Sequence, residues 1–182
     1  MTFDDITNDG RLWAVRYDGC IDNVLDKLFD QWNDIDWLRN FFRNNMNDLT
    51  SYFHITDVNE AIADTIEDSG RLECMIMDIS PSADLDTLFR PLNNYQTSAL
   101  LLDKEKARLK RYIHHTSWLR IYAIRLSEGA YIITGGAIKL TATMEERTHT
   151  ATELKKMECV RNFLLAEGIV DDESFIDFYN AN

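Results

Sequence analysis

The fold of this chain is decided by the stretch Trp118–Leu140, WLRIYAIRLSEGAYIITGGAIKL. Both halves of it are rich in β-branched and aromatic residues, which favour strands. They are separated by Ser127-Glu128-Gly129, which is typical of a hairpin turn because glycine adopts turn conformations easily. We therefore predict a β-hairpin whose second strand is extended or followed by residues 138–141. Gly135-Gly136 is expected to permit a bulge or a close backbone approach at a strand end.

Alternation along the first strand of the hairpin separates its side chains into two faces. The apolar set is expected to face the core and consists of Leu119, Ile121 and Ala123. Arg120 and Tyr122 then point outward together. A cation beside an aromatic ring suits an RNA strand, because the cation binds phosphate while a base stacks on the ring. The pair is therefore a candidate phosphate site.

Charge is divided unevenly along the chain. Its 182 residues carry a net charge of −12, and residues 1–90 account for all of it with 19 acidic and 7 basic side chains. The balance is reversed later, where one acid, Glu105, stands among seven bases: Lys104, Lys106, Arg108, Lys110, Arg111, Arg120 and Arg125. Two interpretations stay open at this point, a solvated exposed face and a site for a polyanion.

Upstream of the hairpin the pattern changes from a strand to helices. Alternation predicts a strand over residues 11–19. Apolar residues spaced by three and four then predict three helices, over residues 21–32, over residues 37–42 and on toward Leu49, and over residues 58–77. Asp34 is the expected N-cap of the second helix. Asp57 and Glu60 form a capping-box pattern for the third, in which Gly70 is a candidate break.

Short elements are expected between these helices and the hairpin. Ser80-Pro81 predicts the start of a short helix that carries Leu85, Leu88 and Phe89. Residues 98–103 are apolar and bounded by turn-forming residues, so they predict a strand. Residues 104–111 fit a helix or a strand, and pattern alone does not decide between them.

Two helices are expected behind the hairpin. Thr150 and Glu153 form a second capping-box pattern, and the helix that follows ends at Gly168, a favourable C-terminal residue. Its expected core stripe consists of Leu154, Met157, Val160, Phe163 and Leu164. Residues 171–179 predict a short terminal helix.

This order of elements predicts an α+β fold, a single domain over residues 1–182 in which helices pack a small antiparallel sheet. No apolar run is long enough to span a bilayer, and the acidic start of the chain lacks the apolar region of a signal peptide. Cys20, Cys74 and Cys159 are too few and too far apart for a disulfide framework. We therefore expect a protein of the reducing cytoplasm, with no membrane partner.

The sequence contains none of the common catalytic or cofactor motifs. It has no GxSxG nucleophile elbow, and the segment around Gly135-Gly136 lacks the spacing of a phosphate-binding loop. His114 and His115 are adjacent, so on a strand they would point to opposite faces and could not easily share one ion. His54 and His149 stand alone. We therefore expect neither a metal nor a cofactor.

The run from Ser117 to Thr141, with the capped helix behind it, resembles the RelE/HigB superfamily of toxins from toxin–antitoxin systems. In that family a strand arginine precedes an aromatic residue by two positions, and a turn, an apolar strand and a short basic segment follow. A basic strand stands before the hairpin, as Lys106–Arg111 does here. The resemblance covers about residues 85–168. It implies a RelE-like sheet and helices over about residues 11–33 and 91–168, with a helical insertion at about residues 34–90.

The resemblance implies a metal-independent endoribonuclease that cleaves mRNA, usually on translating ribosomes, and that an antitoxin protein restrains. Carried over by position, the phosphate-binding arginine is Arg120 and the lysine behind the last strand is Lys139. The family's tyrosine is missing behind that strand, so Arg147 or His149 would have to replace it. The implied catalytic residues are Arg120, Lys139 and His149, and the implied RNA-binding residues are Lys106, Arg108, Lys110, Arg111 and Tyr122.

Other functions fit the same sequence. A toxin-like module without catalytic activity could use its acidic helical half to engage a basic protein partner. A related branch of the superfamily poisons DNA gyrase instead of cutting RNA, and an unrelated α+β domain is a further alternative. The sequence does not separate these.

Overall fold

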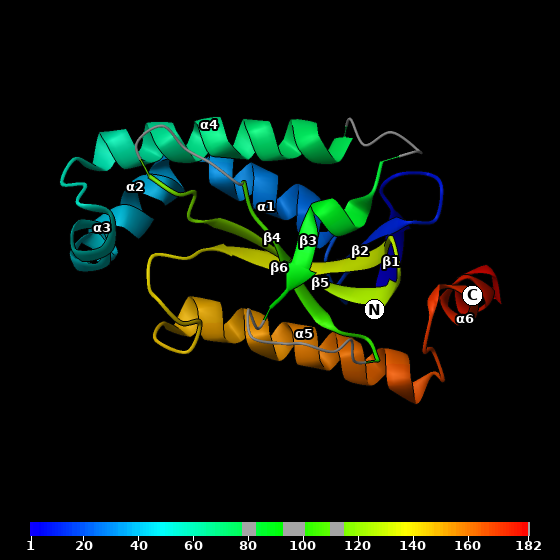
Figure 1. The fold of residues 1–182 in the computed structure, drawn as a ribbon. Helices are drawn as coiled ribbons and strands as arrows, with labels where there is room; N and C mark the ends of the chain where they lie inside the picture. The colour runs from blue at the N-terminus through cyan, green and yellow to red at the C-terminus, as the bar shows by residue number, and fades with distance from the viewer. Residues whose placement is uncertain (78–82, 93–100, 110–114, 182) are drawn as a thin grey trace.

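The hairpin predicted from Trp118–Leu140 lies at the centre of the sheet (Figure 1). In the computed structural model, which describes residues 1–77, 83–92, 101–109 and 115–181, it consists of β5 (Leu119–Ser127) and β6 (Ala130–Ile138). Ser127 pairs with Ala130 across a two-residue turn, where Gly129 has a φ of 72°. A side chain rarely adopts such a φ, so glycine is the natural residue at this position. The hairpin prediction is confirmed.

The sheet has the strand order β1-β2-β6-β5-β4-β3. The other strands are β1 (Thr2–Asp5), β2 (Leu12–Arg16), β3 (Phe89–Pro91) and β4 (Lys104–Ala107). Every neighbouring pair is antiparallel except β2 with β6, so the sheet is mixed and the expectation of a purely antiparallel one is wrong. The parallel pair is possible because helices connect β2 to the later strands and reverse the chain.

Helices cover both faces of this sheet, which gives the fold three layers (Figure 1). The first layer contains α1 (Val24–Asn33), α2 (Ile35–Asn44) and α4 (Val58–Met77), with α3 (Met46–Phe53) at one end. The opposite layer is α5 (Thr148–Ala166). The terminal helix α6 (Asp172–Ala181) packs Phe175 against Phe3 and Trp13. No helix in the described ranges combines the length and apolarity needed to cross a membrane.

Several helix ends agree with their local signals. Asp34 caps α2, because its carboxylate accepts hydrogen bonds from the backbone N–H groups of Asp36 and Trp37 at 2.9 and 3.0 Å. The helix α4 has the predicted bounds and continues through Gly70. Gly168 follows α5 with a φ of 75°, as expected for its C-terminal end. Local side-chain chemistry therefore sets these boundaries.

Other expected boundaries are wrong. Ile21 is exposed outside α1, which begins at Val24 behind the N-cap Asn23. The second helix ends at Asn44, and Leu49 belongs to the separate helix α3. Thr150 does not cap α5, which already begins at Thr148, and its hydroxyl donates to the Met144 carbonyl at 2.6 Å. The capping-box pattern was overridden because Thr150 and its partner, Glu153, are both buried.

The segment before the hairpin also differs from expectation. Residues 101–103 form no strand, and the strand β4 begins at Lys104, which settles the open choice for residues 104–107. A 3₁₀ turn η1 (Leu85–Thr87) replaces the expected short helix, and Phe89 belongs to β3. Ser80-Pro81 lies outside the described residues, as do residues 98–100.

Gly135 and Gly136 let both helical layers approach β6 closely. A β-carbon on Gly135 would clash with the carboxylate of Glu153, which α5 places over the sheet. A β-carbon on Gly136 would lie 2.6 Å from the Arg120 carbonyl oxygen and 2.7 Å from Leu28 Cδ1 of α1. The predicted close approach is confirmed. Tyr122 of β5 is fully buried, so the expectation that it points outward is wrong.

Candidate functional site

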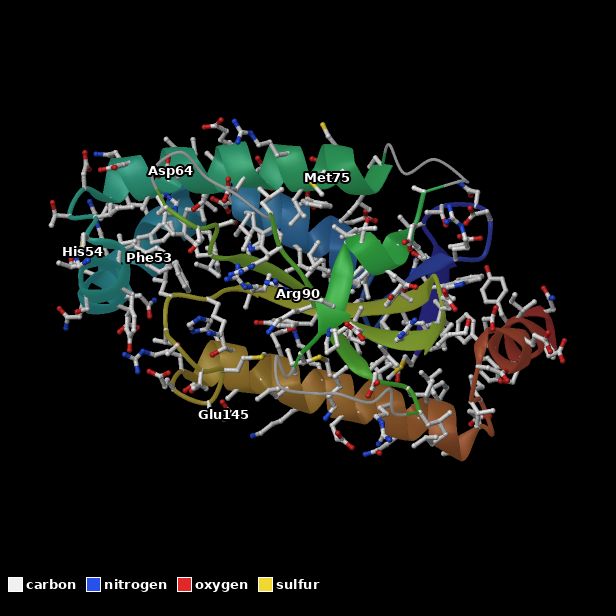
Figure 2. All side chains as sticks on the ribbon, viewed as in Figure 1. Phe53, His54, Asp64, Met75, Arg90 and Glu145 are labelled. Atoms are coloured by element: carbon white, nitrogen blue, oxygen red, sulfur yellow. The ribbon has the colours of Figure 1, made fainter. Side chains whose placement is uncertain are left out.

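A pocket of about 1080 Å³ is lined by residues of β3, β4 and β5, of α5 and of the loop before α5. Figure 2 marks two of its lining residues, Arg90 on β3 and Glu145 in that loop. Cations dominate its described lining: Arg90, Lys104, Lys106, Arg108, Arg120, Lys139 and Arg161. Its carboxylates in the described lining are Asp103 and Glu145. The cavity is therefore basic within a protein that is acidic as a whole.

Strand register brings these cations together. Arg90 of β3 pairs with Lys106 of β4, and Lys106 in turn pairs with Tyr122 of β5. Side chains at paired positions project from the same face of a sheet. Arg120 lies two residues before Tyr122 in β5, so it shares that face. Cations that are distant in sequence therefore meet at one place on the sheet.

The alternation of side chains along β4 also places its one acidic residue, Glu105, on the face away from the pocket. Glu105 lies between Lys104 and Lys106, so its side chain points to the opposite face, where it is buried. Burial raises the pKa of Glu105 to about 7. The strand β4 thus directs its lysines toward the pocket and buries the Glu105 carboxyl group on the opposite face of the sheet.

Several of these cations form no ion pair with a carboxylate in the part of the chain that the structure describes. Lys104 forms an ion pair with Glu158 of α5, and Arg161 lies 3.9 Å from the same carboxylate. In the described ranges no ion pair is formed by Arg90, Arg108, Arg120 or Lys139. We call these four residues and Lys106 the basic cluster. The charge of Arg90, Arg108, Arg120 and Lys139 is available to an anionic ligand.

Arg120 is held at the centre of the basic cluster. Its Nη1 donates hydrogen bonds to the carbonyl oxygens of Ser117 at 2.6 Å and Leu119 at 2.7 Å. Its other two nitrogen atoms have no partner in the part of the chain that the structure describes. Burial, together with the nearby charge of Arg108, lowers the pKa of Arg120 to about 10. The guanidinium is therefore positioned and charged, with donors left for a ligand.

The lysines of the basic cluster have lowered pKa values, because they are partly buried and lie near other cations. Burial, together with the nearby charges of Arg90 and Arg120, lowers the pKa of Lys106 to about 8. Its Nζ donates to the Leu92 carbonyl at 2.7 Å. Burial and Arg120 also lower the pKa of Lys139, whose Nζ donates to the carbonyls of residues 141 and 142. An anion in the pocket would relieve this repulsion.

Tyr122 differs from its expected role. It lines the pocket, but its side chain is fully buried and offers no open ring face for a base to stack on. Its hydroxyl group has no hydrogen-bond partner among the described residues. Burial raises its pKa, so the hydroxyl stays protonated. The stacking role expected from the sequence does not fit this structure, because the ring of Tyr122 itself is fully buried.

The remaining predicted residues are placed as follows. His149 does not line the pocket, because its Nε2 is bonded to the Ile138 carbonyl at 2.9 Å and its ring packs edge-on against Phe41. The structure therefore does not bring His149 to this pocket, and its catalytic role stays a prediction. Lys110 and Arg111 lie outside the described residues.

Sequence reasoning also missed lining residues. Arg90 was overlooked because β3 has only three residues and pairs with a strand far along the chain. Arg161 was overlooked because it lies on a helix that packs on the sheet from elsewhere in the sequence. No group of three potential metal ligands occurs among the described residues. Comparisons with protein-family models, curated proteins and solved structures found no match to this chain.

Proposed function

We propose that this protein binds single-stranded RNA in the basic pocket and cleaves it without a metal ion, as a cytoplasmic RelE/HigB-like toxin. The observation that carries the proposal is the convergence of Arg120, the basic strand β4 and Lys139 on one cavity. These are the positions to which the family resemblance assigns phosphate binding. The expected partners are mRNA, with or without the ribosome, and an antitoxin protein.

The chemistry needs only groups that the pocket contains. The 2′-hydroxyl of RNA can attack the neighbouring phosphorus and displace the 5′-oxygen of the next nucleotide. Negative charge then grows on the phosphoryl oxygens, and the fixed guanidinium of Arg120 would stabilise it. The 2′-oxygen must lose a proton and the leaving oxygen must gain one. Lys106, with a pKa of about 8, is well suited to exchange protons near neutral pH.

The apolar part of the lining favours RNA over a simple anion. Leu92, Leu102, Leu154 and Met144 share the pocket with the cations. Apolar side chains beside phosphate-binding cations suit an unpaired nucleotide, which carries both a base and a phosphate. A base inside a duplex is stacked and paired, so it could not enter the cavity without leaving its helix.

Binding of a basic protein is a second candidate function, and the distribution of acids favours it. Asp26, Asp30, Asp34 and Asp36 are exposed on α1 and α2 or at their junction. These helices lie in the layer opposite α5 (Figure 1). A basic partner such as an antitoxin could therefore bind the helical layer and leave the pocket open.

Expression in bacteria tests the proposal. The wild-type chain is expected to arrest growth, and its purified form is expected to cleave RNA in the presence of EDTA. Arg120→Ala should abolish both effects, because it removes the guanidinium at the centre of the basic cluster. Arg43→Ala on the exposed side of α2 is the matched control and should behave as wild type. Normal growth at high expression of the folded wild-type chain, with intact RNA, would refute the nuclease proposal.

RNA binding is expected to weaken as the pH rises. Lys106 is charged below its pKa of about 8, and above it the free protein must take up a proton to bind an anion. Affinity for a 2′-O-methyl RNA, which cannot be cleaved, should fall by up to about 10-fold between pH 7 and 9. Lys106→Arg keeps the charge and should flatten this profile. Identical profiles for both proteins would show that Lys106 does not contact the ligand.

The contribution of Lys106 to folding stability depends on pH in the opposite direction to its contribution to RNA binding. The pKa of Lys106 is lower in the folded chain than its ordinary value of 10.5, so between about pH 8 and 10.5 the unfolded chain binds more protons. The free energy of unfolding that Lys106 contributes therefore rises with pH in this window. Weaker RNA binding at pH 9 would thus not reflect a less stable protein.

A further inference from the structure

The hydroxyl group of Tyr122 is buried in the lining of the pocket without a partner. The residue is fully buried, and its Oη forms no hydrogen bond within the described residues. Buried hydroxyl groups in proteins almost always have a partner, because leaving water without one costs free energy. The buried Tyr122 hydroxyl, which has no hydrogen-bond acceptor among the described residues, therefore needs an explanation.

Two other tyrosines of this protein follow the general rule. Tyr17, which is partly buried, donates its hydroxyl proton to the Thr134 carbonyl at 2.8 Å. Tyr131, which is buried, donates to the carboxylate of Asp86. Both bonds lie outside the pocket lining. The unpaired hydroxyl is thus a property of the pocket and not of tyrosines in this fold.

No side chain near the Tyr122 hydroxyl accepts a hydrogen bond from it within the described residues. Arg120 and Lys106, the neighbours on the same face, carry only donors. Glu153 acts on Tyr122 electrostatically, but its free oxygen, Oε2, also lacks a partner, so no bond joins the two. The Tyr122 hydroxyl therefore lies beside the donors of Arg120 and Lys106 and has no bonded acceptor within the described residues.

We infer that the Tyr122 hydroxyl donates a hydrogen bond to an oxygen of the phosphate that Arg120 binds, and thereby selects phosphates that enter the pocket. An unpaired strand can bring its backbone to a buried group, whereas the phosphates of a duplex stay at the outer cations. The selection of unpaired RNA rests on the proposed function, but the contact with phosphate does not.

A neutral donor leaves a different signature from a cation. Removing a cation that contacts phosphate lowers affinity and also weakens its dependence on salt, because fewer counterions are released. The hydroxyl carries no charge, so its removal should lower affinity at every salt concentration by the same factor. Because the hydroxyl is unsatisfied in the free protein, its removal should also raise the melting temperature.

Tyr122→Phe tests both signatures. Its melting temperature should rise by about 2–4 °C. Its affinity for a single-stranded 2′-O-methyl RNA should fall by about 5- to 10-fold with an unchanged salt slope, and its weaker affinity for duplex RNA should not change. Tyr17→Phe is the matched control: it removes a bonded hydroxyl outside the pocket, so it should melt at a lower temperature and bind RNA normally.

Calorimetric titration with inorganic pyrophosphate separates this inference from the proposed function. Weaker pyrophosphate binding by Tyr122→Phe supports the phosphate contact even if RNA does not bind, and that result would refute RNA as the ligand. Equal binding of pyrophosphate by wild type and Tyr122→Phe overturns the inference. A lower melting temperature for Tyr122→Phe also overturns it, because the hydroxyl would then have a partner within the protein. Absence of binding to either ligand refutes both proposals.

Discussion

A protein in which Lys106 and Arg120 are both replaced by glutamine is expected to bind single-stranded RNA at least about 100-fold more weakly than wild type. Each side chain would donate a charge-assisted hydrogen bond to phosphate, and such bonds contribute about 1.5–3 kcal/mol each. Glutamine keeps a polar side chain but removes the charge. Fluorescence anisotropy with a labelled 2′-O-methyl RNA measures the loss without interference from cleavage.

The matched control for this variant is Lys27→Gln with Arg43→Gln. Both control residues are exposed on the helical layer, and the control removes the same two charges from the chain. The control should bind nearly as well as wild type, because only the position of the charges differs. Equal losses in the two variants would mean that RNA responds to net charge and does not bind in the pocket. Thermal melting of each variant verifies that it is folded.

The largest expected effect on stability comes from Gly136→Ala. Its new β-carbon would lie 2.6 Å from the Arg120 carbonyl oxygen and 2.7 Å from Leu28, and backbone cannot move aside cheaply. We expect the free energy of unfolding to fall by about 2–3 kcal/mol, as for other overpacked cores. Urea denaturation measures this change.

Gly70→Ala is the control for this substitution. Gly70 lies inside α4, and a β-carbon there would meet nothing within 4 Å. Alanine favours a helix over glycine, so this variant should be more stable than wild type by about 0.5–1 kcal/mol. If Gly136→Ala were as stable as wild type, α1 would not pack against β6 as closely as the structure describes.

The parts of the fold that could be predicted from the sequence are those determined by residues close together in the chain. The hairpin follows from alternation and one turn glycine, and the cap of α2 follows from the Asp34 side chain. The bounds of α4 follow from apolar spacing over a long segment. Each signal acts within a few residues, so tertiary structure had little to add.

What sequence missed depends on contacts between distant segments. Tyr122 has the alternation of an outward residue, but it is fully buried, which no signal within β5 predicts. Thr150 and Glu153 form a good capping pattern, yet Glu153 is drawn over Gly135 and does not serve the helix end. Strand β1 is only four residues long and owes its existence to pairing with β2.

The residues of the candidate site also fall into those that nearby sequence predicts and those that depend on contacts between distant segments. The cations of β4 and β5 were recognisable because they are close together in sequence and alternate on one face. Arg90 joins them only through the pairing of β3 with β4. His149 was assigned by its position in the family pattern, but the backbone places its ring against Ile138 and Phe41. Resemblance in sequence could not supply that orientation.

The most direct test of the central claim, that the basic cluster binds the RNA backbone, is the salt dependence of binding. The affinity of wild type for single-stranded 2′-O-methyl RNA should fall with salt at a logarithmic slope of about −2 to −3, which corresponds to about three or four phosphate contacts. The variant lacking Lys106 and Arg120 charges should show a slope that is shallower by about 1.4. A wild-type affinity that is independent of salt, or equal slopes for the two proteins, would contradict the claim.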